Sequence, residues 1–207
     1  SIDNQKLLKI IDKKMQKLTN LFGPVLKKDL EIIIYHPKDS ILININNPHW
    51  NHSLGFTYYS KDKIVIKDPS YAYISNDKFI QVIEHELNHL MINRFTNKIP
   101  RWFKEGMAMY VANEIQLNHK LKVIKKLYSK KLIPLQNLNL FNNLNNEDYK
   151  LAYAQSALYV ESLVNIYGEK IIYDIIEECK TNNDFNDVIY ILTNQSIYSL
   201  EKKILQL

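Results

Sequence analysis

The first part of the chain passes from helical to strand-like spacing of its hydrophobic residues. From Leu7 to Leu21 most apolar side chains fall three or four residues apart, and the pattern stops at Gly23-Pro24. A helix is therefore predicted there. The β-branched run "LEIIIY" at 30–35 stops before a proline and predicts a strand. Another short run, "ILINI" at 41–45, predicts a second strand.

A hairpin is predicted next, in "GFTYYSKDKIVIKDP" at 55–69. Its two runs of β-branched and aromatic residues lie on either side of the polar stretch Ser60–Lys63, which is typical of a turn between antiparallel strands. The first 70 residues therefore predict a helix on a small, mostly antiparallel sheet.

After Pro69 the hydrophobic spacing becomes helical. Ser75 is a good N-cap, Asp77 suits a first helical turn, and apolar residues follow at helical spacing as far as Met91. Further helices are predicted from after Pro100 to about Leu117, from about 148 to 167 with Gly168 as C-cap, and two or three times beyond, with an Asn-rich loop over much of 134–147. This order predicts an α+β fold in one domain, 1–207, with a sheet-containing lobe at 1–95 and a helical lobe at 96–207.

Composition limits the classes of partner. With 207 residues, 46% of them hydrophobic and 24% charged, the chain is typical of a soluble globular protein, which we expect to be a monomer. The net charge of +5 comes from scattered lysines. No dense basic block is interleaved with aromatic residues, which argues against nucleic-acid binding and for a solvated basic surface. No apolar run approaches the roughly 20 residues that a membrane span requires.

A single cysteine, Cys179, excludes an internal disulfide framework, and no cysteine spacing is typical of a metal site. Many bacterial surface proteins also avoid cysteine. The compartment therefore stays open between a secreted or cell-surface bacterial location and a cytoplasmic one.

The stretch "IEHELNHL" at 83–90 places two histidines and two glutamates within a helix that otherwise has the pattern of a buried one. A buried imidazole or carboxylate costs several kcal/mol unless it is paired or binds a metal. His85 and His89 are four residues apart, so they share one helical face with Cβ atoms about 5–6 Å apart, which suits two ligands of one Zn²⁺. Glu86 leans toward the same site and can accept a proton from a metal-bound water.

A third ligand is available downstream in "IPRWFKEGMAMYV". Glu105 opens the next predicted helix, and the fifteen residues between it and His89 are enough for the chain to turn and send a carboxylate back. His85, His89 and Glu105 form a His₂Glu set, which leaves a fourth zinc position for water. The alternative is an ordinary buried polar cluster, which must explain three convergent ligands and a base.

At these motifs the sequence resembles the gluzincin metallopeptidases, in which H-E-x-x-H is followed by W-x-x-E-G-x-A-x-Y on the next helix. Here the two motifs read "HELNH" and "PRWFKEGMAMY", while "YAQSALYVESLVNIYGEKII" and "NQSIYSLEKKI" resemble the C-terminal half of small peptidase MA-like domains, so the resemblance covers about 55–207. It implies a zincin-like fold with a zinc cleft between the two lobes. It also implies zinc on His85, His89 and Glu105, and a general base at Glu86. Met109 stands where thermolysin-like enzymes carry an acidic residue, so the group that orients the histidines stays open.

The resemblance separates two kinds of peptidase. One-metal aminopeptidases carry a G-x-M-E-N segment whose glutamate binds the free amine of the substrate. The corresponding region here, "SLGFTYYSKDK", has no acid before Asp62, which weakens that reading. An extended peptide paired with a strand such as Lys63–Lys67 would suit cleavage within a chain.

Tyr153 is the candidate oxyanion donor, because gluzincins commonly use a hydroxyl from a later helix. Tyr110 competes for this role, although its place five residues after Glu105 turns it away from the ligand face of that helix.

Four further residues are less informative. His49 and His52 in "PHWNH" have ligand-like spacing, but the segment has the composition of a loop and favours a surface or packing role over a second metal site. Trp102 and Phe103 are expected in the core rather than in a substrate pocket.

The sequence therefore predicts a zinc metalloendopeptidase that hydrolyses peptide bonds of polypeptides with a zinc-activated water. Glu86 would serve as base and proton carrier, and Tyr153 would hold the oxyanion. Two alternatives stay open. The first is an aminopeptidase of the same clan, and the second is a zinc-binding module without turnover.

Overall fold

A computed structural model of the chain describes residues 3–22, 29–38, 53–141 and 144–205. Residue contacts divide the chain into two compact units, Ser1–Arg94 and Phe95–Leu207. The strand predicted at 41–45, together with His49 and His52, lies outside the described residues.

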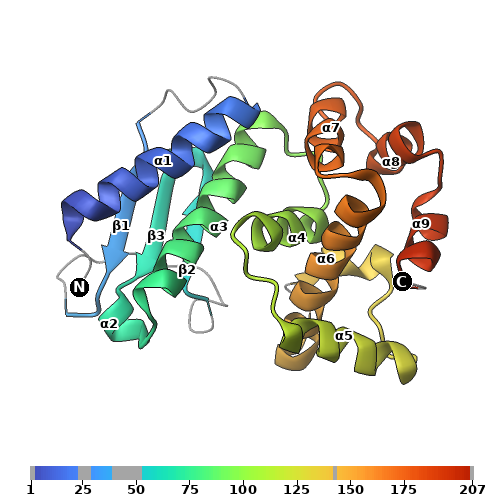
Figure 1. The fold of residues 1–207 in the computed structure, drawn as a ribbon, viewed down its shortest axis with the longest axis horizontal. Helices are drawn as coiled ribbons and strands as arrows, with labels where there is room; N and C mark the ends of the chain where they lie inside the picture. Colours follow the sequence, from blue (N-terminus) through green and yellow to red (C-terminus); the bar gives the residue numbers. More distant parts are fainter. Residues whose placement is uncertain (1–2, 23–28, 39–52, 142–143, 206–207) are drawn as a thin grey trace. The chain divides into compact units, whose positions relative to one another are not determined.

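The first unit combines helices with a three-stranded sheet (Figure 1). Its elements are α1 (Asn4–Phe22), β1 (Glu31–Tyr35), β2 (Gly55–Tyr58), the 3-10 turn η2 (Tyr59–Lys61), β3 (Lys63–Lys67), the short α2 (Pro69–Ala72) and α3 (Asn76–Phe95). The predicted first helix, the strand at 30–35, the hairpin and the helix that follows Ser75 are all confirmed. Ser75 is the predicted cap, since its hydroxyl accepts a hydrogen bond from the Lys78 N–H at 3.2 Å.

The sheet is mixed, so the prediction of a mostly antiparallel sheet is wrong. Its strand order is β1-β3-β2. β2 runs antiparallel to β3, with Phe56 opposite Val65, while β1 runs parallel to β3, with Ile33 opposite Val65. Hydrophobic periodicity predicts strands but not their direction, and the long connection from β1 to β2 allows the chain to re-enter the sheet from the same end.

The central position of β3 corrects a second expectation. Both hydrogen-bonding edges of Lys63–Lys67 are occupied, by β1 on one side and β2 on the other. This strand therefore has no edge left for a substrate peptide. Among the described strands, β2 forms the neighbour of β3 on the side opposite β1.

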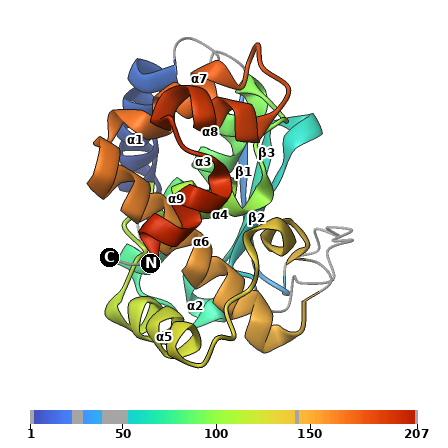
Figure 2. The same cartoon turned by 90° about the vertical axis from the view of Figure 1, so that its right-hand side faces the viewer.

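Helices α1 and α3 lie side by side on one face of the sheet, as Figures 1 and 2 show from two directions. An ion pair links them, because Lys14 Nζ lies 2.6 Å from the Glu84 Oε2 atom, which is buried. The strand β3 provides the most deeply buried part of the sheet, since Ile64, Val65 and Ile66 are fully buried. Eleven of the twenty residues of α3 are buried.

The second unit is helical. Its elements are α4 (Arg101–Val111), α5 (Leu117–Tyr128), the 3-10 turn η3 (Leu135–Asn139), α6 (Asn146–Tyr167), α7 (Lys170–Glu178), α8 (Phe185–Thr193) and α9 (Ile197–Ile204). Helix α6 packs against α4, α5, α7 and α9 and forms the centre of this unit. The predicted helix over 148–167 is confirmed. Gly168 ends it at φ 85°, a conformation that glycine adopts without steric cost.

The prediction of one helix from after Pro100 to about Leu117 is wrong in its length. α4 ends at Val111, Asn113 adopts a left-handed conformation with φ 53°, and a new helix begins at Leu117. Asparagine tolerates this conformation better than most residues. The break allows α4 and α5 to pack separately against α6.

Close packing of α4 on α6 depends on Gly106. A Cβ atom at this position would overlap the Ser156 carbonyl group and lie 2.7 Å from Val160 Cγ2. The glycine that follows Glu105 in the motif therefore has a packing role. Trp102 and Phe103 are 3% and 0% exposed, so their expected place in the core is confirmed. No helix among the described residues has the length and apolar character of a membrane span.

Candidate metal centre

Helix α3 carries the polar motif within a nearly continuous apolar surface. Two of its buried polar residues have clear partners within the first unit: Glu84 pairs with Lys14, and the Asn88 side-chain amide donates to the Glu84 carbonyl at 3.2 Å. Such pairing offsets the cost of burying polar groups in a core helix. His85, Glu86 and His89 remain as the candidate reactive set on this helix.

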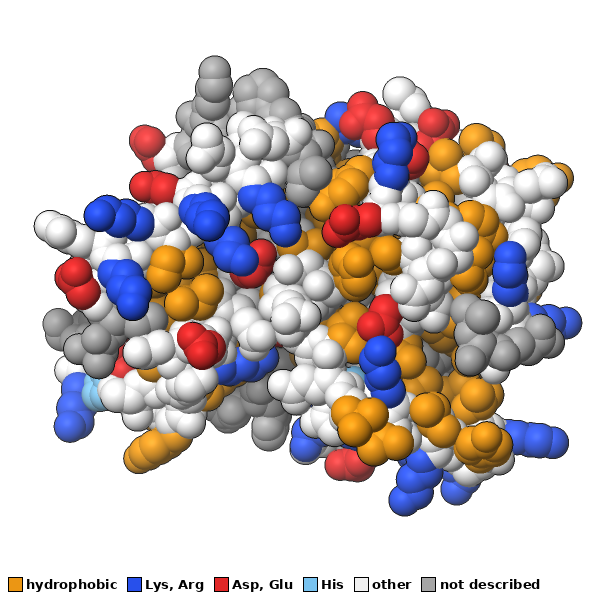
Figure 3. All heavy atoms as spheres, in the orientation of Figure 1, with side chains coloured by type: hydrophobic (Ala, Val, Ile, Leu, Met, Phe, Trp, Pro, Cys, Tyr) orange, Lys and Arg blue, Asp and Glu red, His pale blue; other side chains and the backbone are white. Residues whose placement is uncertain are grey.

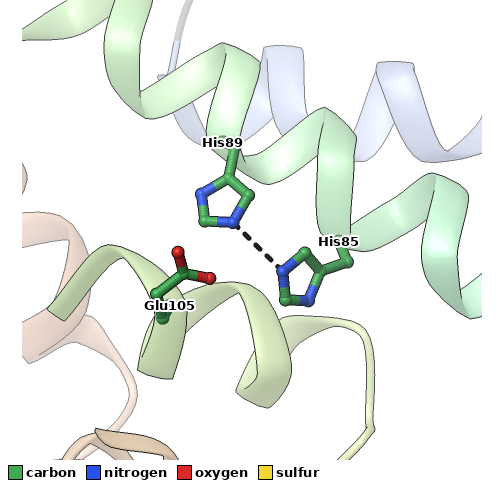
Figure 4. Close-up of side chains that lie close together, drawn as sticks. All are labelled: His85, His89 and Glu105. Atoms are coloured by element: carbon green, nitrogen blue, oxygen red, sulfur yellow. Dashed lines mark hydrogen bonds between the residues drawn. The ribbon is translucent and has the colours of Figure 1, made fainter. Parts of the chain in front are cut away.

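His85 and His89 point their rings toward each other, as expected for residues four apart on a helix (Figure 4). Their Nε2 atoms lie 3.0 Å apart, and their ring planes meet at 74°. Two nitrogens bound to one tetrahedral ion at about 2.1 Å would lie about 3.4 Å apart. The observed pair is thus within a few tenths of an ångström of the spacing that a shared ion requires.

Glu105 comes from the second turn of α4 and is 6% exposed. One ligand atom from each of His85, His89 and Glu105 lies within 4.8 Å of the other two. In the part of the chain that the structure describes, this is the group of histidine, cysteine or acidic residues that could hold a metal ion. Two imidazoles and one carboxylate fit a divalent transition-metal ion such as Zn²⁺.

Arg101 holds Glu105 from within α4. Its Nε atom lies 3.3 Å from Glu105 Oε1, and its guanidinium carbon lies 4.6 Å from the centre of the Phe141 ring. Burial alone would lower the pKa of Arg101, but Glu105 and the nearby tyrosines raise it above its usual value. Arg101 therefore stays charged and restrains the orientation of the carboxylate. Arg101 was not predicted from the sequence, although residues four apart on a helix lie close enough to form an ion pair, so its position before Glu105 could have indicated this contact.

Glu86 is held by the sheet beneath α3. The Thr57 hydroxyl lies 2.8 Å from Glu86 Oε2 and 3.1 Å from the Glu86 carbonyl oxygen, both of which can accept its proton. Gly55 lies on the same face of β2, and a Cβ atom there would approach Val82 Cγ1 to 3.1 Å and Glu86 Cγ to 3.2 Å. Gly55 therefore leaves space for the Glu86 side chain, and Thr57 supplies its hydrogen bond. Sequence spacing did not reveal these contacts.

Tyr153 lies on α6 with its hydroxyl 3.2 Å from that of Tyr149, and the ring of Phe141 packs edge-on against it with a centroid distance of 5.2 Å. Burial, followed by the charge of Glu105 and the proximity of Tyr149, raises the pKa of Tyr153 well above its usual value. The phenol therefore keeps its proton at neutral pH and can donate a hydrogen bond.

Tyr110 and Met109 lie in different surroundings. The pKa of Tyr110 is raised by burial and by Glu169 and Glu161, which are not metal-ligand candidates. Met109 is 5% exposed within the core, so this position supplies no acidic partner for the histidines.

Comparison with known proteins identifies one family. The model of the Peptidase MA superfamily matches residues 11–204, which is nearly the whole chain. Neither a curated protein nor a solved structure gives a match. Membership of this superfamily indicates a peptidase, and its members typically depend on a metal. The chain belongs to the Peptidase MA superfamily.

Proposed function

We propose that this protein is a zinc-dependent metalloendopeptidase whose metal ligands are His85, His89 and Glu105. The observation that carries the proposal is the convergence of the three ligand atoms within 4.8 Å, with Glu86 adjacent in sequence to one of them. Zinc bound by such a set polarises a carbonyl group and lowers the pKa of water.

Glu86 is the proposed general base. Its carboxylate would accept a proton from the attacking water and pass it to the leaving amine as the peptide bond breaks. The Thr57 hydroxyl supports this role, because it fixes one carboxylate oxygen at 2.8 Å and thereby restricts rotation of the side chain. Thr57 acts as a positioning residue.

Arg101 and Tyr153, both in the second unit, have the remaining proposed roles. Arg101 would keep Glu105 in one orientation through the 3.3 Å contact. Tyr153 would donate a hydrogen bond through its hydroxyl to the oxygen that becomes negative during the reaction, because its buried phenol is protonated at neutral pH.

The surroundings of β2 favour cleavage within a polypeptide over removal of a terminal residue. Asp62, the first acidic residue after the start of β2, lies 2.8 Å from Arg94 Nε in an ion pair. An acid already engaged in this way is poorly suited to bind the free amine of a substrate. Cleavage within a polypeptide, rather than removal of a terminal residue, is therefore the activity that we propose.

One experiment tests the proposal against both alternatives. The purified protein, loaded with zinc, is incubated with a proteome-derived peptide library, and the products are identified by mass spectrometry, with Glu86→Gln as control. An endopeptidase produces internal cuts that the Glu86→Gln variant does not. Cleavage that stops when the N-terminus is blocked would indicate an aminopeptidase. A zinc-loaded protein that cleaves nothing would indicate a binding module.

A further inference from the structure

Helix α5 presents an unusual apolar surface to solvent. Leu117, Leu121, Ile124 and Tyr128 are 70%, 55%, 43% and 85% exposed. Their spacing of four, three and four residues places them within an arc of about 60° on one face of the helix, which we term the α5 stripe. Val123 points into the core instead, with 4% exposure. The apolar face that packs on the unit and the apolar face that meets solvent are therefore different faces.

Figure 3 shows this surface over α5, at the lower right, where hydrophobic side chains gather beside Lys and Arg side chains. Single exposed leucines are common on protein surfaces, but a contiguous row of four large apolar residues on one helix indicates a binding surface.

The segment around the stripe is basic and contains no acid. Six lysines occur between Leu117 and Lys131, and no aspartate or glutamate occurs from 115 to 146. Lys120 pairs with Glu161 of α6 at 2.8 Å. Lys125, Lys130 and Lys131 are exposed, and Lys125 lies about 70° around the helix from the centre of the stripe.

The distribution of charge indicates which kind of partner could cover the α5 stripe. A second copy of this chain would bring a second lysine-rich helix against the first, and the two would repel each other. The cores of protein interfaces are depleted in lysine. A helix that lies in the plane of an anionic lipid surface requires instead an apolar stripe of leucine, isoleucine and aromatic residues with lysines along its polar flank.

We propose that α5 docks this protein onto anionic lipid membranes, with the α5 stripe inserted among the headgroups. The lysines would extend their aliphatic stems along the apolar surface and place their ammonium groups near the phosphates. Tyr128 suits the interface between membrane and water, since tyrosine combines an apolar ring with a polar hydroxyl. This binding is peripheral and does not depend on the proposed peptidase activity.

The test is flotation of the zinc-loaded protein with vesicles of phosphatidylcholine alone or with about one third phosphatidylglycerol. The expected result is binding to the anionic vesicles at least tenfold stronger than to the neutral ones, and weaker binding at high salt because ions screen the lysines. The paired variants Leu121→Ser/Ile124→Ser and Lys125→Glu/Lys130→Glu should each lose at least tenfold in affinity. Tyr128→Trp should show a blue shift in fluorescence with anionic vesicles only.

Matched changes on α1 serve as controls. Leu8 is 60% exposed, and Lys6 and Lys9 are exposed, so Leu8→Ser and Lys6→Glu/Lys9→Glu repeat the same chemistry elsewhere. They should bind like the parent, and all variants should keep the parent's circular dichroism. The proposal is overturned if the parent ignores anionic vesicles, if the α1 and α5 variants lose binding equally, or if the α5 stripe proves to mediate a dimer in sedimentation experiments.

Discussion

Replacement of Thr57 by valine tests how the proposed base is held. Valine has nearly the shape of threonine and suits a β-strand, but it has no hydroxyl to donate to the Glu86 carboxylate. A hydrogen bond to a charged group contributes about 1.5–3 kcal/mol. If this interaction is needed to hold Glu86 in its reactive orientation, its loss should lower kcat by about ten- to a hundredfold.

The assay separates positioning from general damage. Zinc content and KM of Thr57→Val should stay close to those of the parent, because Thr57 is not a proposed ligand. The melting temperature should fall by several degrees at most, since the lost hydrogen bond contributes about 1.5–3 kcal/mol to stability, and the protein should stay folded at the assay temperature. Thr57→Ser keeps the hydroxyl and should recover most of the activity. Thr19→Val removes a hydroxyl that donates to the Met15 carbonyl in α1, and it should leave kcat unchanged.

Two results would refute this reasoning. Full activity of Thr57→Val would show that the hydrogen bond does not position the base, and equal losses in Thr57→Val and Thr57→Ser would assign the effect to packing. A crystal structure of Thr57→Val gives a readout independent of turnover, since the Glu86 carboxylate should adopt a different or a second orientation. An unchanged carboxylate would also contradict the proposal.

Four further outcomes are expected. Elemental analysis should find about one equivalent of zinc in the parent and much less in His89→Ala, and full metal content in this variant would disprove the ligand set. Chelation should stop turnover and lower the melting temperature, because a metal held by the folded state alone stabilises that state by mass action. Calorimetry with and without a chelator measures the melting temperature. An unchanged value would argue against a bound ion. Tyr153→Phe should keep zinc and KM but lose at least tenfold in kcat, whereas Tyr110→Phe should change little; a fully active Tyr153→Phe would remove this residue from the mechanism. Gly106→Ala should lower the free energy of unfolding by about 1–3 kcal/mol through overlap with Ser156, which denaturant titration measures, and an unchanged stability would contradict the close packing of α4 on α6.

Local patterns in the sequence predicted elements whose ends have a chemical signal. Ser75 begins α3 by capping it, and Gly168 ends α6 in a conformation that few other residues adopt readily. The break between α4 and α5 had a weaker signal, because Asn113 adopts a left-handed conformation there but asparagine is also common in other conformations. The parallel direction of β1 had no local signal, since direction depends on how a long connection returns to the sheet.

The same distinction applies to the candidate site. His85, Glu86, His89 and Glu105 could be proposed from spacing, because their positions on two helices follow from the helical repeat. Thr57 could not, because its contact with Glu86 joins residues 29 apart and depends on the register of β2 beneath α3. A one-residue change in that register would turn Thr57 to the opposite face of the sheet.

The partners of the motif residues therefore carry information that the motif lacks. Glu86 and Glu105 are both carboxylates on buried helical faces, but Glu86 accepts a hydrogen bond from a neutral hydroxyl and Glu105 lies beside a guanidinium. A guanidinium beside a carboxylate favours its charged form, and a hydroxyl donor restricts the rotation of a carboxylate. These two contacts are compatible with the proposed roles of Glu105 as ligand and Glu86 as base, and the variants at Thr57 and His89 test those roles separately.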